Sequence, residues 1–519
     1  MRMFVDLNEL KEDQTIHADL CIIGAGAAGI TVAREFINKP YTVYVLESGG
    51  FDIESETQTL KTGTIEGDIR VPDWMLQSAS SPHNSYLEDS RLRVFGGSTQ
   101  HWGGFCLPIP TTDFEARPWI PDSGWPIRRE DLNPYYQRAA SICQISVPEL
   151  LSNNPTFIHD PIDWGLKNSV FETRFIHLSP PTQFGFVYRA ELAQAKNIHL
   201  IQHANVTELL LTKNGKSIEQ LHVRSLHGRH LKLKAKRIVL AAGGIENSRL
   251  LLASNSVHKH GVGNEHDQVG RYFMEHPEMS LGQFIFNKAA SQLQSYTIHD
   301  SPLSSTPAEK DFGRQALGVL FPTPEIQRKR GILNFSAQLQ FPLERDLIEQ
   351  QEISDTISRM IGDSQFKNPT IGTFFIRAEQ SPNPNNRVTL DHALDPFSKP
   401  KTKLIWQLYP DDLDILMKSL ELLAIEFGRS GRGRVRLEGI ERLGQSIPGG
   451  CHHMGGTRMH QDPKRGVVNE QCRVHGIDNL YVAGSSVFPT GSCVNPTLTI
   501  VALALRLSER LLSDLSSTT

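Results

Sequence analysis

Four residues near the start of the chain have the types and the spacing that bind a dinucleotide. Gly24, Gly26 and Gly29 form a GxGxxG pattern after the apolar run 20–23, and Glu47 follows about twenty residues later. Glycine permits a tight turn and a close approach of backbone amides to a pyrophosphate, whose negative charge favours a helix N-terminus. A carboxylate at Glu47 can accept hydrogen bonds from a ribose diol. The pattern predicts dinucleotide binding, and by itself it does not separate FAD from NAD.

Two other stretches place histidine beside glycine pairs. Residues 96–104, "GGSTQHWGG", hold His101 and Trp102 between two such pairs. Residues 450–459, "GCHHMGGTRM", carry two histidines before another pair. Because glycine lets the backbone come close to a flat or charged ligand, the first stretch is predicted to hold His101 against something bound.

Three segments of strand and helix character must position these residues. Residues 18–50 read as strand, glycine turn, helix and second strand, and residues 235–254 repeat the strand, turn and helix. Residues 479–511 return to this character, and Pro496 and Thr497 suit the start of the final helix. Such units in one chain predict a doubly wound sheet assembled from separated segments.

The middle of the chain has a different pattern. From about Met279 to Arg436 there are long alternating runs with prolines, and the spacing predicts a helix over 411–427. We expect an antiparallel sheet with helices packed on it. A helix is also predicted to start at 131–139, and 197–211 reads as strands around a turn. The charged stretch 343–360 is interpreted as a solvated helix, with a lid or a partner-binding helix as the alternative.

The composition excludes several classes of protein. The 519 residues are 39% hydrophobic and 21% charged with a net charge of -4, which gives no reason to expect a nucleic-acid partner. No window approaches the ~18 apolar residues of a membrane helix, and the acidic N-terminus is unlike a secretion signal, so a cytoplasmic location is expected. The six cysteines form no CxxC pair, which predicts small core residues and no metal site.

The order of the motifs resembles the glucose-methanol-choline (GMC) family of FAD-dependent oxidoreductases. The similar blocks are "GAGAAG" with Glu47, "GGSTQHWGG", "AAGGIENSRLLLAS", "VGRYFMEHP", "HMGGT" and "NPTLTIVALA". The resemblance covers nearly the whole chain. It implies FAD rather than NAD, with the adenosine half held by the N-terminal unit and the isoalloxazine at the interface with a substrate domain.

The expected fold is therefore α/β, with a Rossmann-like FAD-binding domain built from discontinuous segments and an α+β substrate domain on an antiparallel sheet. The predicted FAD-binding segments are 1–165, 195–278 and 445–519, and the substrate domain is 279–444 with part of 166–194. The predicted cofactor-binding residues are Gly24, Gly26, Ala27, Ala28, Gly29, Glu47, Ser48, Arg93, Gly96, Gly97, Ser98, His101, Trp102, Gly103, Gly104, Val206, Ala242, Gly243, Asn247, Gly484, Ser485, Asn495, Pro496 and Thr497.

The resemblance also implies a catalytic pair. The family motif His-x-x-Gly-Thr/Gly is assigned to His453, with His452 one residue off register, and the residue before the last helix is Asn495. A neutral imidazole with a pKa of ~6.5 can take the hydroxyl proton as a hydride leaves for flavin N5. Asn495 can donate a hydrogen bond to the developing alkoxide without titrating. His452 is interpreted as a structural residue that can shape the site.

The stretch around His101 carries a second implication. In the pyranose oxidases of the family, a histidine–tryptophan pair lies three residues beyond a glycine pair, and the histidine is bonded to the flavin 8α-methyl carbon. The pair Gly96–Gly97, followed after three residues by His101 and Trp102, reproduces that spacing, so FAD is predicted to be covalently bound through His101. The alternative is a His101 that only contacts the flavin ring.

The branch of the GMC family that this sequence resembles contains pyranose oxidases, bacterial sugar dehydrogenases and glycoside oxidases. This resemblance implies oxidation of a secondary alcohol on a carbohydrate to a ketone. The electron acceptor stays open between oxygen, a quinone and a redox protein, and a partner could export the chain. The alternatives are a non-sugar alcohol in a biosynthetic pathway, a lyase with structural FAD, and a non-catalytic binding subunit. Residues 280–380 are expected to line the substrate pocket.

Overall fold

The structure, a computed structural model, describes residues 4–72, 75, 85–145, 164–167, 169–287, 296, 316–340, 370–437 and 447–517. Its first layer is an eight-stranded sheet in the order β1-β8-β3-β2-β11-β10-β9, with β20 also paired to β11. The strands are β1 (Phe4–Asp6), β2 (Gln14–Ile23), β3 (Val43–Leu46), β8 (Ile198–Gln202), β9 (Asn205–Leu211), β10 (Ile218–Arg224), β11 (His230–Leu240) and β20 (Leu480–Val482). The predicted helix at 343–360 lies outside the described residues.

The parallel part of this sheet confirms the doubly wound prediction. β2, from the first strand–turn–helix segment, pairs in parallel with β11 from the second, and β11 pairs in parallel with β20 near the C-terminus. The helices that follow these strands are α1 (Ala27–Glu35), α9 (Gly244–Ala253) and α13 (Thr497–Ser516). Three distant segments of the chain therefore bring their strand-to-helix turns to one edge of the sheet.

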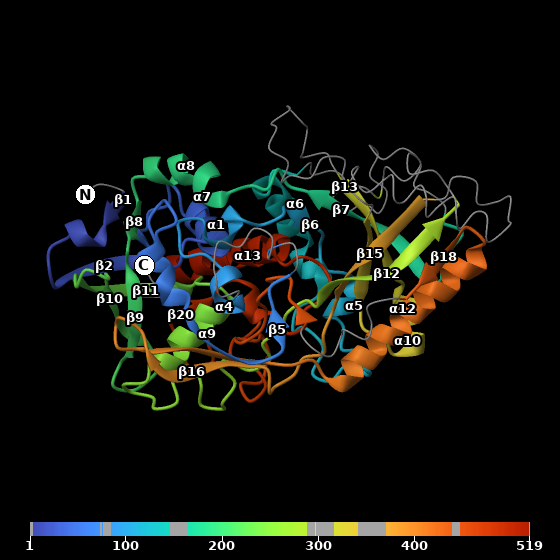
Figure 1. Cartoon of the computed structure of the whole chain (residues 1–519). Coiled ribbons are helices and arrows are strands. Elements are labelled where there is room, and N and C mark those ends of the chain that lie inside the picture. The colour runs from blue at the N-terminus through green and yellow to red at the C-terminus, as the bar shows by residue number, and fades with distance from the viewer. Residues whose placement is uncertain are drawn as a thin grey trace.

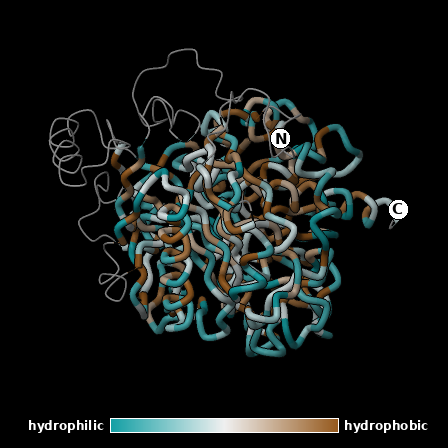
Figure 2. Tube along the Cα trace, turned by 90° about the vertical axis from the view of Figure 1, so that its right-hand side faces the viewer, coloured by the Kyte–Doolittle hydropathy of each residue, from teal (hydrophilic) through white to brown (hydrophobic). Residues whose placement is uncertain are grey.

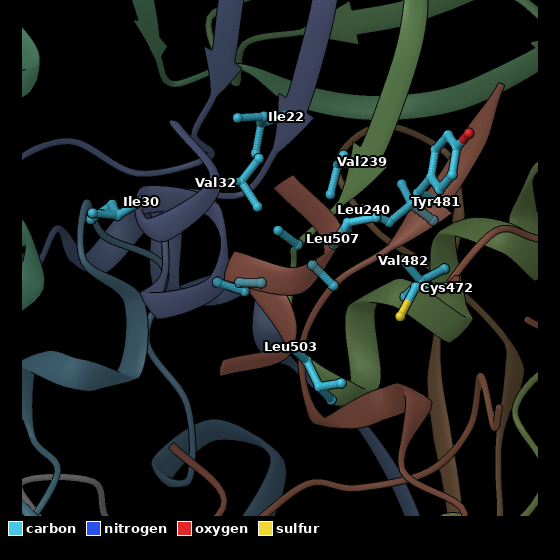
Figure 3. Close-up of a cluster of buried hydrophobic side chains, with 14 of the residues drawn as sticks. Ile22, Ile30, Val32, Val239, Leu240, Cys472, Tyr481, Val482, Leu503 and Leu507 are labelled. Atoms are coloured by element: carbon cyan, nitrogen blue, oxygen red, sulfur yellow. The ribbon is translucent and has the colours of Figure 1, made fainter. Parts of the chain in front are cut away.

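Apolar side chains hold these helices on the sheet. Figure 3 shows Ile22, Val239 and Val482 from three neighbouring strands close to side chains of α1 and α13. Leu503 and Leu507 of α13 are buried in the same cluster. Burial of one such side chain contributes about 1.5–3 kcal/mol, so this core fixes where the last helix begins relative to the first.

The second layer is a seven-stranded antiparallel sheet in the order β18-β12-β15-β14-β13-β7-β6, which lies at the other end of the molecule with α12 along it (Figure 1). Its strands are β6 (Phe105–Cys106), β7 (Phe171–Leu178), β12 (Glu278–Phe286), β13 (Ala316–Pro322), β14 (Phe335–Gln340), β15 (Thr370–Ala378) and β18 (Gly433–Arg436). The helix α12 spans Pro410–Ser430 and buries Leu416, Leu420 and Phe427, as its periodicity predicted. A second hydrophobic core fills this part of the chain.

Smaller sheets join the two parts. β4 (Gly63–Gly67) pairs with β17 (Pro400–Trp406), which pairs with β16 (Arg387–Leu394), and β5 (Ile69–Arg70) pairs with β19 (Ile447–Pro448). β6 belongs to the second sheet although its residues fall in the first predicted segment, so the predicted boundaries divide strands that the structure pairs.

Hydrophilic loops gather at the lower edge of Figure 2.

Two further sequence predictions concern the burial of the cysteines and the absence of a membrane-spanning helix. Five cysteines are buried, whereas Cys451 is partly exposed, so the prediction of core residues holds for all but one of the six. Within the described ranges, the helices include none that is long and apolar enough to span a bilayer.

Candidate active site

A cavity of about 950 Å³ lies between the two main sheets. One wall consists of the β2–α1 turn, the stretch 97–104 and the first residues of α9 and α13. The other wall comes from the second sheet, with Gln338 and Gln340 on β14 and Phe375 and Arg377 on β15. The part of the 280–380 segment that the structure describes therefore contributes to the cavity.

The β2–α1 turn is made of backbone packed against backbone. Gly24 has φ +100°, and a Cβ on it would lie 2.6 Å from the Ala241 carbonyl oxygen. A Cβ on Gly29 would lie 1.9 Å from the carbonyl oxygen of Gly24, whereas one on Gly26 would meet no atom of the described residues within 4 Å. Glycine is thus required at Gly24 and Gly29 by packing, while Gly26 leaves open space at the start of α1 for a ligand.

Glu47 closes this end of the cavity. Its carboxylate accepts hydrogen bonds from the backbone N–H of Ala25 at 2.8 Å and of Gly49 at 3.0 Å. Burial raises the pKa of Glu47, while these two hydrogen bonds and the charge of Arg93 act in the opposite direction. The carboxylate ties the end of β3 to the glycine turn, and it also lines the cavity.

Three arginines surround one partly buried carboxylate beside the cavity. Glu246 on α9 lies 2.7 Å from Arg91, 2.8 Å from Arg93 and 3.3 Å from Arg249. Burial alone would raise the pKa of Glu246, but the three guanidinium groups outweigh it and hold that pKa well below its usual range. Arg249 also pairs with Asp395 at 2.6 Å. Arg91, Arg93 and Arg249 all line the cavity, and guanidinium groups suit phosphate.

Most of the predicted cofactor-binding residues line this cavity. They are Gly24, Gly26, Ala27, Ala28, Glu47, Ser48, Arg93, Gly97, Ser98, His101, Trp102, Gly103, Gly104, Val206, Ala242, Gly243, Gly484, Ser485, Asn495, Pro496 and Thr497. The structure thus brings together residues from seven separated stretches of sequence.

Three of the predicted cofactor-binding residues are not among those that line the cavity. Gly29 permits the packing of α1 described above, and Gly96 has φ +102° with the backbone of Gly185 in the place of a Cβ. Asn247 is fully buried, and its side chain accepts a hydrogen bond from the Ala242 N–H at 2.9 Å. These residues shape the loops of the cavity and do not face it.

His101 follows the turn 97–100 and lines the cavity. The neighbouring Trp102 also lines the cavity, and its indole N–H donates to the Thr182 carbonyl oxygen at 3.0 Å. Burial, and then the charge of Lys61, lower the pKa of His101 to about 4, so its ring is neutral near pH 7.

The structure does not bring His453 and Asn495 together. His452 Nε2 lies 3.1 Å from Asn495 Nδ2, whereas His453 Nε2 lies 2.9 Å from the Ser90 hydroxyl, with its ring near those of Tyr86 and Phe273. Both histidines line the cavity. Their segment pairs with the chain at Met274, and successive side chains of a segment paired in this way point to opposite sides. The histidine that faces Asn495 is therefore the one that sequence analysis treated as structural.

The motif alone fits both histidines. His453 satisfies it through Gly456 and Thr457, and His452 satisfies it equally through Gly455 and Gly456. The sequence prediction overlooked the second match. Only the direction of each side chain separates the two residues.

Sequence analysis missed three further residues beside this pair. Arg377 Nη1 donates to Asn495 Oδ1 at 2.8 Å, and its Nε is hydrogen-bonded to Glu278. His276 Nδ1 lies 2.9 Å from His452 Nδ1. A charged residue inside the apolar run "TFFIRA" and the "MEHPE" block were the available signals, since a buried charge needs a specific partner.

Comparison with known proteins now decides the family. The family model described as FAD dependent oxidoreductase matches residues 19–260, and the one described as GMC oxidoreductase matches residues 382–504. The chain belongs to the GMC oxidoreductases. It is thus an FAD-dependent enzyme that acts on alcohol groups.

Relatives of this GMC oxidoreductase match over nearly the full length. The 2-methyl-1,2-propanediol dehydrogenase of Mycolicibacterium austroafricanum is 26% identical over 96% of this chain and 95% of its own. The fructose dehydrogenase large subunit of Gluconobacter japonicus is 23% identical over 97% and 99%. Among solved structures, formate oxidase from Aspergillus oryzae is 16% identical, with a TM-score of 0.62 over 98% of this chain and 100% of that one, which shows a shared fold.

The residues at the cavity fit FAD. The glycine turn and the N-termini of α1 and α13 offer free backbone N–H groups, and the arginines around Glu246 add positive charge. Glu47 presents a carboxylate at the end of β3, where a ribose diol is expected in this fold. The donor set thus matches a pyrophosphate flanked by a sugar.

Proposed function

We propose that this GMC oxidoreductase oxidises a secondary alcohol on a sugar or glycoside to a ketone, with His452 as the base and Asn495 as the oxygen-binding residue. The observation that carries the proposal is the 3.1 Å approach of His452 Nε2 to Asn495 Nδ2 at the wall of the cavity. Bound FAD would supply the acceptor for the hydride. The assignment of the base departs from the motif-based prediction of His453.

The surroundings of His452 suit a proton acceptor. Burial, followed by the neighbouring His276 and Arg377, lowers the pKa of His452 well below its ordinary value, so the imidazole is neutral near pH 7. The side chain of His452 is 15% exposed, and the residue lines the cavity. A substrate hydroxyl that lies beside both side chains can donate its proton to Nε2 while Asn495 Nδ2 donates to its oxygen.

The opposite wall supports a polyhydroxylated substrate. Gln338 and Gln340 are two residues apart on β14, so their side chains lie on the same face of the strand, and both line the cavity. Phe375 pairs with Gln338 across the strands and presents an apolar ring beside these amides. Amides that donate and accept, next to an apolar surface, match the hydroxyls and the C–H face of a sugar.

A non-sugar vicinal diol is the second candidate, because the relative from Mycolicibacterium is named for such a substrate. Anaerobic bleaching of the flavin separates the two candidates when the protein is mixed with monosaccharides, glycosides and short diols. Bleaching by diols and by no sugar would replace the carbohydrate proposal.

Substitution of the two adjacent histidines tests the base. We expect His452→Ala to slow flavin reduction by about 10²–10⁴-fold, the usual contribution of a general base, while the protein keeps its yellow colour. His453→Ala is the matched control, and we expect a less than tenfold change because His453 bonds to Ser90. Stopped-flow absorbance at 450 nm measures both. A larger loss in His453→Ala than in His452→Ala would restore the motif-based assignment.

The covalent attachment of FAD through His101 remains a prediction. It is supported by the position of His101 in the cavity lining and by its neutral ring, which leaves a nitrogen lone pair for bonding. After acid precipitation, yellow colour is expected in the pellet for the wild type and in the supernatant for His101→Ala. Colour in the supernatant for both proteins would mean that His101 only contacts the cofactor.

A further inference from the structure

A chain of hydrogen bonds runs through the proposed base from one side of the cavity wall to the other. Arg377 Nη1 donates to Asn495 Oδ1 at 2.8 Å, and Asn495 Nδ2 lies 3.1 Å from His452 Nε2. His452 Nδ1 lies 2.9 Å from His276 Nδ1, and His276 Nε2 lies 3.1 Å from the Gly491 carbonyl oxygen. Its two ends belong to groups with only one possible role: a guanidinium only donates, and a carbonyl only accepts.

These ends determine the direction of every bond between them. Because Arg377 must donate, Asn495 Oδ1 is the acceptor, so the amide nitrogen of Asn495 is turned to His452 and donates to Nε2. A His452 nitrogen that accepts carries no proton, so the proton of the neutral ring is on Nδ1 and is donated to His276 Nδ1. His276 then carries its own proton on Nε2, where the Gly491 carbonyl accepts it. Each hydrogen bond from Arg377 to Gly491 thus joins one donor to one acceptor.

We infer that His276 and Arg377 are positioning residues that hold His452 in its Nδ1–H tautomer, with the Nε2 lone pair directed at Asn495 and the substrate hydroxyl. The inference rests on the proposed role of His452 as base and adds how the ring is kept ready for it. A histidine in the other tautomer would present a proton at Nε2 and could not accept one there. His276 and Arg377 act through their neighbours, and neither takes the substrate proton.

The charges around the ring are consistent with this arrangement. His276 is fully buried, and burial followed by the charge of Arg377 lowers its pKa to about 3, so it stays neutral and can accept from His452. Glu278 pairs with Arg377 and lies 3.8 Å from His452 Nδ1. The backbone N–H groups of His276 and His452 both donate to Glu275 at 2.8 Å, which fixes the two rings relative to each other.

The same contacts assist the step that follows. When Nε2 takes the substrate proton, His452 becomes an imidazolium with N–H groups on both nitrogens. His276 Nδ1 still accepts from its Nδ1–H, and the Glu278 carboxylate lies near the new charge. The hydrogen bonds from His452 to His276 and from His276 to Gly491 therefore keep their directions during proton transfer.

Two substitutions at His276 separate positioning from simple packing. His276→Leu fills the site without an acceptor, and we expect flavin reduction at saturating substrate to slow at least tenfold with little change in KM. His276→Gln offers an amide oxygen to His452 and an N–H to Gly491, and we expect it to recover most of the rate. Wild-type reduction by the Leu variant, or a Gln variant as slow as the Leu variant, would overturn the inference.

The tautomer can also be read without turnover. Nitrogen NMR of the FAD-loaded wild type, labelled with ¹⁵N-histidine and free of substrate, distinguishes a protonated from an unprotonated ring nitrogen. The His452 signals are those that disappear in His452→Ala, and we expect a protonated Nδ1 and an unprotonated Nε2. A proton on Nε2 would overturn the inference even if the His276 variants fail to fold. Retained flavin reduction in His452→Ala would instead overturn the proposed base, so the two failures are distinguishable.

Discussion

The two ends of the cavity are built in opposite ways. The end at the β2–α1 turn is formed mainly by backbone atoms, with Gly24 packed against Ala241 and Gly29 against Gly24 where no Cβ fits. Glu47 is bonded there to the Ala25 N–H. The end at His452 is formed by side chains from separate segments, with Asn495 and Arg377 contributed by distant parts of the chain. A backbone site depends on local geometry, whereas a side-chain site depends on the packing that brings its members together.

This difference determines how each end responds to substitution. The turn tolerates no added atoms at its packed glycines but depends little on side-chain chemistry. The catalytic end depends on which side chain occupies each position and on the buried groups that hold the loops before it. Three predictions follow from this contrast, beginning with the largest expected effect.

Gly29→Val is expected to abolish FAD binding. Its Cβ alone would lie 1.9 Å from the Gly24 carbonyl oxygen, so α1 must move away from the turn. The ratio of absorbance at 450 nm to that at 280 nm in purified protein measures bound flavin. Gly428→Ala in α12 is the control, because a Cβ there meets nothing within 4 Å in the part of the chain that the structure describes, and wild-type flavin content is expected. Full flavin content in Gly29→Val would show that the turn is not a packed backbone site.

Arg117→Met is expected to lower the free energy of unfolding by about 3–5 kcal/mol, the cost of leaving buried charge unpaired. Arg117 donates two hydrogen bonds to Glu379 at 2.8 and 2.6 Å and lies 3.4 Å from Asp113. Asp113 in turn accepts from Ser492, in the loop that leads to Asn495. Flavin reduction should slow as well, because this loop positions Asn495.

Denaturant unfolding measures the loss of stability. Arg128→Met is the matched control: Arg128 is exposed and lies 3.7 Å from Asp131, and such surface pairs contribute up to about 1 kcal/mol. Equal losses in the two variants would mean that the buried cluster does not support the catalytic end.

The smallest expected effect is on the pH dependence of the free energy of unfolding, and it concerns His453. Burial, then the charge of Arg91, lowers the pKa of His453 to about 3, so below the ordinary value of 6.5 the unfolded chain binds a proton that the folded chain does not. His453 therefore makes the protein less stable as the pH falls from 7 to 5, by up to about 2 kcal/mol. In His453→Gln this part of the loss should vanish.

Unfolding of both proteins by urea at pH 7 and pH 5 measures that difference. Other groups titrate in this range, such as Glu275, whose pKa burial raises to about 8, but they are common to both proteins and cancel in the comparison. An unchanged pH dependence in His453→Gln would show that His453 is solvated.

Much of the fold was predictable because its signals are local. The GxGxxG turn, the alternating strands and the apolar face of α12 depend on residues within one or two turns of each other, and the structure has these elements within a few residues of their predicted bounds. The return of β20 to the first sheet was also predicted, since a strand, turn and helix at the end of the chain match the first unit.

The catalytic end was only partly predictable for the opposite reason. Asn495 was identified from its place before the last helix, but the choice between His452 and His453 depends on which side of an extended segment each side chain points to. Arg377 was missed because nothing near it in the sequence indicates its partners. Its contacts with Glu278 and Asn495 join residues about one hundred positions away.

The sequence by itself determined the backbone cradle, because glycine spacing, strand and helix periodicity and a carboxylate at the end of β3 act through neighbouring residues. Tertiary structure alone decided which histidine faces Asn495 and which groups orient it. A single step along an extended chain reverses the direction of a side chain, and only the packing of β12, β15 and the loop before α13 sets that direction.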